Sequence, residues 1–197
     1  MKRIFLLLTI FFALQTAGYG QQFVVCEVPD TVDTHGQDLC LLRLSHYTLK
    51  GDTATGVMIV SRRMADATCK AFRALYNIKY PVERMELAQG YKDDEASMRA
   101  NNTSGYLFRT IAGTRRLSKH ARGLALDLNP LYNPCLTLKD GKVSDIQPRT
   151  AMRYANRRQT FPCTVTPQVV AIFKGYGFAW GGDWRSKKDY QHFEFRE

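Results

Sequence analysis

Acidic side chains are scarce in this chain of 197 residues: 18 Asp and Glu stand against 28 Lys and Arg, so the formal net charge is +10. The sequence also lacks internal repeats and low-complexity tracts, which excludes repeat architectures. It has no helix-turn-helix pattern, no zinc-finger spacing and no run of aromatic residues interleaved with Lys and Arg. We therefore expect no nucleic-acid partner, in spite of the basic charge.

Close cysteine pairs are absent as well. The chain has five cysteines, and no two of them have the CxxC spacing of a compact zinc or redox site. They are Cys26, Cys40, Cys69, Cys135 and Cys163. In an oxidising compartment up to four could form disulfides, and a bond between Cys135 and Cys163 would close a polar segment. Spacing leaves the connectivity open, and the odd cysteine is most simply a buried thiol.

Long apolar runs are missing beyond the N-terminus, where residues 1–20 have the three-part layout of a secretory signal. Lys2 and Arg3 precede an uncharged run from Ile4 to Leu14, and small residues follow. No later stretch approaches the roughly 20 apolar residues of a spanning helix, so we expect no stable membrane insertion once the signal is removed. A retained N-terminal anchor is the alternative.

Export determines which partners the basic charge favours. Removal of Lys2 and Arg3 lowers the net charge of +10 by two, to +8. We expect the product in the periplasm or cell envelope, where its acidic partner would be a polyanionic envelope polymer or an acidic peptide.

The rest of the chain has the length of one domain. We expect an N-terminal arm over 21–38 and a domain over 39–197. Its predicted elements are a hairpin of strands at 39–49 and 57–60, a helix at 61–76 capped by Ser61, further strands at 85–91, 124–128 and 192–195, and a helix at 166–174 that begins with Thr166 and Pro167. The long loop 100–114 carries apolar residues and is expected to pack near a site. The basic segment 136–161 shows no apolar period, so we expect it to contribute charge rather than core.

Polar residues in an apolar setting identify the candidate site. From Leu124 to Leu128 leucines alternate with Ala125 and Asp127, as in a strand with one face on the core. A buried Asp needs a partner. His120 can fold back toward Asp127 because Gly123 permits a turn between them.

The C-terminal region can complete this site. With His192, residues His120 and Asp127 supply the three protein ligands that are typical of a catalytic zinc, whose fourth position binds water. Asp189 is then a carboxylate that can move protons. Residues three apart on a regular strand point to opposite faces, so Asp189 is expected in the turn that enters the last strand. The alternative is a pair of core histidines with a salt-bridged Asp127.

Together these residues resemble a known family. The pattern Ser118-x-His120-x-x-Gly123-x-Ala125-x-Asp127, followed by Trp180-Gly-Gly-Asp-Trp184 and Asp189-x-x-His192-Phe193, is similar to the M15, or VanY-like, zinc D-Ala-D-Ala carboxypeptidases and endopeptidases. Within that family, the subgroup of phage and bacterial L-alanyl-D-glutamate endopeptidases is closer still. The resemblance runs from about Leu39 to the C-terminus.

The resemblance implies roles for individual residues. It places zinc on His120, Asp127 and His192, and makes Asp189 the general base and later the proton donor. Arg109 best matches the arginine that holds the substrate carbonyl as charge develops. Ser118 would orient the site or bind peptide, and Trp184 would contact the substrate.

The implied fold is a single α+β domain in which one antiparallel sheet carries the metal site and helices flank it, as in Hedgehog-type domains and DD-peptidases. Cys135 departs from the family pattern, because an aromatic or aliphatic residue is expected after Asn133-Pro134. The segment 136–161 also shows little of that pattern.

The function expected from the resemblance is a monomeric zinc peptidase that hydrolyses an amide bond in peptidoglycan stem peptides. Sequence leaves open whether it is a D,D-carboxypeptidase or an L-Ala-D-Glu endopeptidase. A non-catalytic, zinc-stabilised wall-binding module of the same fold is the alternative, and hydrolysis of ordinary L-peptides is a third hypothesis.

Overall fold

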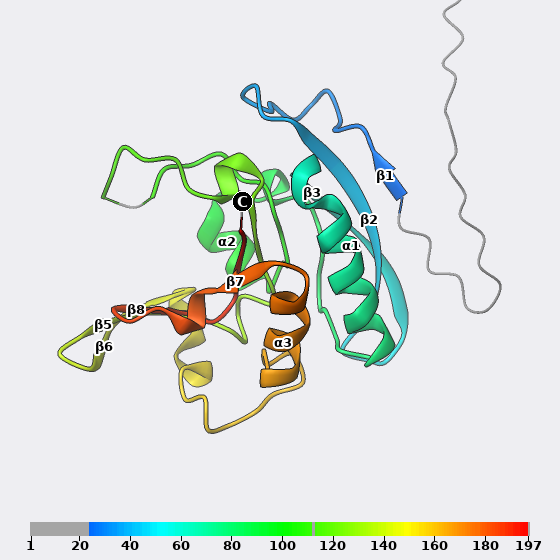
Figure 1. Ribbon diagram of the computed structural model, residues 1–197. Coiled ribbons are helices and arrows are strands. Elements are labelled where there is room, and N and C mark those ends of the chain that lie inside the picture. Colours follow the sequence, from blue (N-terminus) through cyan, green and yellow to red (C-terminus); the bar gives the residue numbers. More distant parts are fainter. Residues whose placement is uncertain (1–23, 112, 197) are drawn as a thin grey trace, which may run out of the picture.

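Three small antiparallel sheets form the framework of this α+β protein (Figure 1). The computed structural model describes residues 24–111 and 113–196. The first sheet has the order β1-β2-β3, the second β4-β9-β7 and the third β6-β5-β8. Their strands are β1 (Val24–Cys26), β2 (Leu39–Tyr47), β3 (Thr53–Ser61), β4 (Ala125–Asp127), β5 (Cys135–Lys139), β6 (Lys142–Gln147), β7 (Phe178–Trp180), β8 (Lys187–Asp189) and β9 (His192–Phe195).

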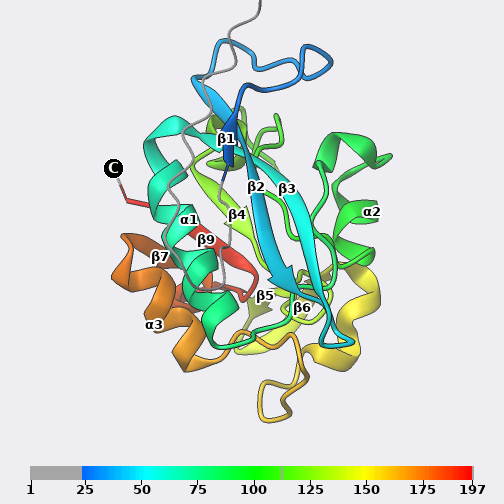
Figure 2. The ribbon, with the colours of Figure 1, turned by 90° about the vertical axis from the view of Figure 1, so that its right-hand side faces the viewer.

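Helices cover the first two sheets. The chain forms α1 (Arg62–Asn77), α2 (Asp94–Arg99) and α3 (Pro167–Gly175), with the 3-10 turns η1 (Ala88–Gly90), η2 (His120–Arg122), η3 (Arg149–Tyr154) and η4 (Gly181–Asp183). Helix α1 begins where the Ser61 side chain accepts a hydrogen bond from the Arg63 N–H. Figure 2 shows the long strands β2 and β3 side by side, with α1 on one side of them and α2 on the other.

The main core lies between α1, α3 and the first two sheets. Phe173 of α3 stacks on Phe193 of β9, with ring centroids 4.1 Å apart, and meets Phe178 of β7 edge to face at 5.3 Å. Phe72 of α1 meets the Phe173 ring edge to face, with ring centroids 6.2 Å apart. Removing a buried Phe ring costs about 3–5 kcal/mol, so this cluster holds β9 firmly against both helices.

Glycines allow the first and second sheets to approach each other. Gly105 lies against the Ile59 carbonyl of β3, and Gly123 adopts a left-handed φ of 64° against the backbone of Ser61. The Tyr106 N–H donates to the Ile59 carbonyl at 2.7 Å, and the Ser61 N–H donates to the Gly123 carbonyl at 2.8 Å. A Cβ at either glycine would meet backbone atoms. The segment between them is therefore joined to β3.

Several sequence predictions are confirmed here. The hairpin at 39–60 forms as β2 and β3, and both helices begin at the predicted caps Ser61 and Thr166. The last predicted strand forms as β9. The α+β class is also confirmed, with the antiparallel strands in three sheets, of which the second carries Asp127 and His192. No described helix has the length and apolar character needed to cross a membrane.

Other predictions are wrong. Segment 136–161 is not merely a charged excursion, because β5, β6 and η3 enclose a small core of Leu136, Ile146 and Ala151. The stretch 85–91 forms η1 instead of a strand. Cys135 and Cys163 are both free thiols, so the suggested disulfide between them does not form.

Candidate metal centre

Two histidines and an aspartate converge in the interior. His120 Nε2 lies 3.3 Å from Asp127 Oδ2, and His192 Nδ1 lies 3.1 Å from Asp127 Oδ1. The two ring nitrogens are 3.1 Å apart. All three residues are buried, and one ligand atom from each falls within 4.8 Å of the others, so they could hold a metal ion.

Strand pairing brings these residues together. Asp127 and His192 are directly opposite in the β4–β9 register, which fixes their separation through backbone hydrogen bonds. His120 comes from η2, just before β4. Ser118 closes this turn, because its Oγ accepts a hydrogen bond from the Ala121 N–H at 3.1 Å.

Each histidine has one ring nitrogen that faces away from the cluster. The hydrogen-bond partner of that nitrogen determines whether the nitrogen inside the cluster has a lone pair for a cation. His120 Nδ1 lies 2.7 Å from the Gly105 carbonyl, which can only accept, so Nδ1 carries the proton and Nε2 of the neutral ring has a lone pair. His192 Nε2 faces Glu194 Oε2 at 3.4 Å, which favours a lone pair on its Nδ1. Three acceptors then face one point.

Electrostatics describe the same cluster when no metal is bound. Burial alone would raise the pKa of Asp127, but the charges and hydrogen bonds of His120 and His192 hold it well below its usual range. Burial opposes a charge on His192, yet its hydrogen bonds to Asp127 and Glu194 raise the pKa of His192 to about 10. Without a metal, the cluster therefore keeps a proton at the position where a cation is needed.

A second buried carboxylate lies beside the cluster. Asp189 ends β8 opposite Cys135 of β5, so it is a strand residue and not part of the turn that the sequence suggested. Its Oδ1 is buried and has no hydrogen-bond partner. Burial raises the pKa of Asp189, and the charge on Asp127 acts in the same direction, while His192 and Lys187 oppose it.

Comparison with known families now identifies this region. A family model described as D-alanyl-D-alanine carboxypeptidase matches residues 112–195. The match supports M15 peptidase family membership for residues 112–195. No solved structure matches the chain. The match supports the sequence-based resemblance, and the M15 segment contains the three clustered residues together with Asp189.

Arg109 precedes the matched M15 segment and lies at its edge. Its Nε is 3.0 Å from Asp94 Oδ2 at the start of α2, and its carbonyl accepts a hydrogen bond from the Ser118 N–H. Burial raises the pKa of Asp94, and charges on Arg109, Asp127 and His120 also act on it.

Trp184 lies beside His192 of the cluster. Its ring centroid is 5.2 Å from that of His192, and the residue is half-buried. Trp184 and Ser118 thus both adjoin residues of the cluster, Trp184 through its ring and Ser118 through the turn that carries His120.

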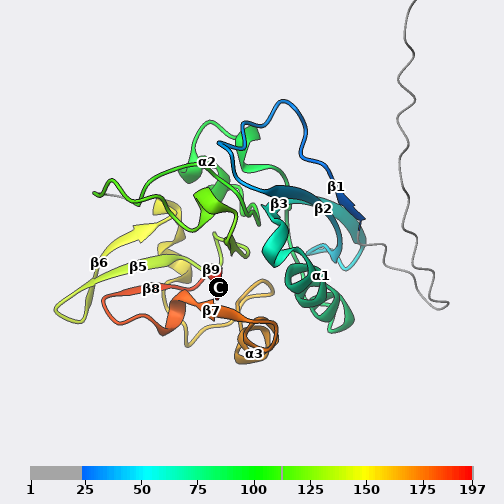
Figure 3. The ribbon, with the colours of Figure 1, turned by 45° about the horizontal axis from the view of Figure 1, so that its top comes forward.

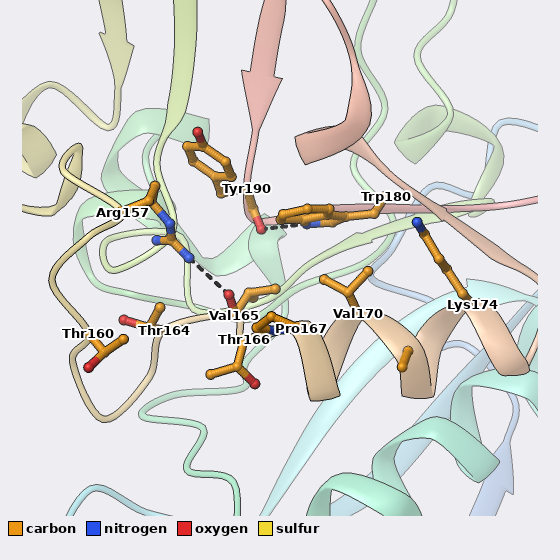
Figure 4. Close-up of a pocket in the computed structure, with 11 residues that line it drawn as sticks. Arg157, Thr160, Thr164, Val165, Thr166, Pro167, Val170, Lys174, Trp180 and Tyr190 are labelled. Atoms are coloured by element: carbon orange, nitrogen blue, oxygen red, sulfur yellow. Dashed lines mark hydrogen bonds between the residues drawn. The ribbon is translucent and has the colours of Figure 1, made fainter.

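A cavity of about 490 Å³ lies apart from these residues, since none of the three clustered side chains lines it. Figure 4 shows Trp180 above the first turns of α3, with Arg157 and Tyr190 at one end and Lys174 at the other. Arg157 is already bonded to three carbonyl-type oxygens, and Lys174 pairs with Asp183 at 2.7 Å. Both cations are therefore already paired with groups of the protein itself.

Sequence reasoning missed three residues that support the cluster. Asp94 was visible only as part of an acidic run, and Gly105 acts through its carbonyl, which carries no side-chain signal. Glu194 had a detectable signal, because it stands two residues after His192 on the same strand face.

Proposed function

We propose that the protein is a zinc peptidase that hydrolyses an amide bond in peptidoglycan stem peptides. The observation that carries the proposal is the convergence of His120, Asp127 and His192 beside Asp189, whose buried Oδ1 has no partner. The match of residues 112–195 to a carboxypeptidase family supports the substrate class.

The donor set suits zinc. Two imidazole nitrogens and one carboxylate are three ligands of the type that catalytic zinc uses, with a fourth position left for water. Gly105 and Glu194 orient the two rings from behind, as is usual for metal-bound histidines. A zinc ion held there would lower the pKa of a bound water to about 7.

Asp189 would perform the proton transfers. Its pKa is raised by burial, which suits a group that must accept a proton and later release it near neutral pH. We assign its free Oδ1 to take the proton of the attacking water and to deliver it to the leaving amine. A wall-binding module without turnover would have no use for this carboxylate.

The remaining site residues would handle the peptide. Arg109 would stabilise negative charge on the substrate carbonyl, an effect worth about 3–4 kcal/mol for a well-placed donor. Ser118 would keep His120 in place through its bond to Ala121. Trp184 would form an apolar wall beside His192.

The proposal also covers the setting of the protein. We propose that residues 1–20, which lie outside the described residues, direct export to the periplasm or cell envelope, and that residues 39–197 act there as a monomer with a Hedgehog-type or DD-peptidase fold. The basic charge would favour the anionic wall polymer. D,D-carboxypeptidase and L-Ala-D-Glu endopeptidase activity both fit this site.

Digestion of purified sacculi tests the proposal. Zinc-loaded wild type should change the muropeptide profile, and Asp189→Asn should lose at least 100-fold in rate while it keeps its zinc. Asp140→Asn is the matched control, because Asp140 lies in an exposed turn and undergoes the same chemical change. If zinc-loaded wild type leaves the muropeptide profile unchanged, the peptidase assignment is wrong and the binding module is favoured.

A further inference from the structure

Lys187 places a cation beside the proposed proton carrier. Lys187 and Asp189 are alternate residues of β8, so their side chains share one face of the strand. Strand β8 lies beside β5 (Figure 3), where Thr137 pairs with Lys187 and Cys135 pairs with Asp189. Lys187 Nζ lies 3.7 Å from Asp189 Oδ2. The ammonium is therefore next to the oxygen of Asp189 that is not needed for proton transfer.

The ammonium is both charged and reachable. Burial opposes its charge, but the negative charge of Asp189 beside it raises the pKa of Lys187, so it stays protonated at neutral pH. Its side chain is 44% exposed, whereas that of Asp189 is 12% exposed. Burial raises the pKa of the neighbouring Cys135 thiol, which therefore stays neutral and does not cancel the lysine charge. Lys187 can thus meet a ligand that enters from solvent.

Both candidate reactions bring a carboxylate to this position. When a terminal D-Ala is removed, the leaving residue carries the free C-terminal carboxylate. When the bond between L-Ala and D-Glu is cut, the leaving residue is linked onward through its γ-carboxyl and keeps a free α-carboxylate. In each case only one carbon separates the carboxylate from the amine that Asp189 must protonate.

We propose that Lys187 is a specificity-determining residue that binds the free α-carboxylate of the residue on the leaving-amine side of the scissile bond. This inference rests on the proposed peptidase function. It names the feature that the two candidate substrates share. The competing role is purely local, since Lys187 could simply neutralise Asp189 and thereby position the base.

Matched substrates separate these roles. The probes are two pairs of synthetic stem peptides that differ only in a carboxylate or carboxamide: a D-Ala-D-Ala terminus as acid or amide, and an L-Ala-γ-D-Glu unit with its α-group as acid or amide. For the bond that wild type cleaves, kcat/KM should favour the acid by about 10- to 100-fold, as expected for a charge-assisted contact.

Lys187→Met should remove this preference, because it should lower kcat/KM for the acid far more than for the amide. Lys187→Arg should keep a preference for the acid, and Lys187→Glu should reverse it. Lys139→Met is the charge-matched control, because Lys139 is exposed on neighbouring β5. Circular dichroism and zinc content establish that each variant is folded and loaded.

The outcomes are distinct. If Lys187→Met lowers cleavage of acid and amide by the same factor, the lysine only positions Asp189 and the inference is wrong. An unchanged preference in Lys187→Met also overturns it. If loaded wild type cleaves no member of either pair, the proposed function itself fails, and that failure is recognised before any Lys187 variant is measured.

Discussion

Glu194 shows how much of a metal centre can depend on a residue outside the ligand set. Its carboxylate lies 3.4 Å from His192 Nε2, and the hydrogen bond to His192 lowers the pKa of Glu194 below the usual carboxyl range. A charged acceptor at this position fixes the ring orientation and makes the inner nitrogen a better donor to a metal.

Replacement of this carboxylate should weaken metal binding. Glu194→Gln keeps the size of the side chain but loses its charge, so zinc affinity should fall by about 10- to 100-fold. Competition with a chromophoric chelator measures the change, and exposed Glu27→Gln provides the control. Equal affinities in the two variants would show that Glu194 does not support the ligand.

At the scale of elements, the contact between β3 and the segment before η2 determines where His120 lies. Gly105 fits against the Ile59 carbonyl, and its own carbonyl accepts the His120 hydrogen bond. A single methyl group at this position would separate the two segments and move that acceptor.

Gly105→Ala should therefore change stability and metal binding together. We expect a loss of about 1–3 kcal/mol in the free energy of unfolding, as for overpacked interiors, and weaker zinc binding. Urea unfolding and zinc competition measure the two effects. Gly90→Ala is the control, because a Cβ there meets no atom within 4 Å. If Gly105→Ala has the stability and zinc affinity of wild type, the two segments can separate without loss of free energy and the prediction is wrong.

The elements that sequence predicted correctly have local signals. Helices α1 and α3 begin at Ser61 and Thr166, where a side chain caps the first turn, and such caps are visible within a few residues. The third sheet was missed because its central strand β5 pairs with β8, about 50 residues later. Pairing over that separation has no local pattern, so a short polar strand resembles a loop.

The same distinction applies to the candidate site. His120, Asp127 and His192 could be grouped from the sequence because polar residues stood out in apolar stretches, and the structure brings them together. The support from Asp94 could not be found in this way. An aspartate in an acidic run at the start of α2 gives no local sign that it will meet Arg109.

For the whole molecule, metal binding and folding stability are coupled. The cluster buries an aspartate and two histidines, and His192 holds a proton there when no metal is bound. A ligand that binds only the folded state stabilises it by about 4 kcal/mol at 1,000 times its dissociation constant.

Chelation should consequently lower the melting temperature. For a protein of this size, about 4 kcal/mol corresponds to roughly 8–16 °C. Differential scanning calorimetry with excess zinc and with a chelator measures the difference. His120→Ala should show no such shift, because it lacks one ligand. A shift of equal size in that variant would place the stabilising metal elsewhere.

The register of β4 and β9 also bears on how the chain reaches its native state. Asp127 and His192 are opposite each other although 65 residues separate them along the chain. Pairing across so long a loop is slow compared with formation of α1 or the β2–β3 hairpin, which join neighbouring residues. The rate at which tight zinc binding appears during refolding would therefore measure the late step in which β9 pairs with β4.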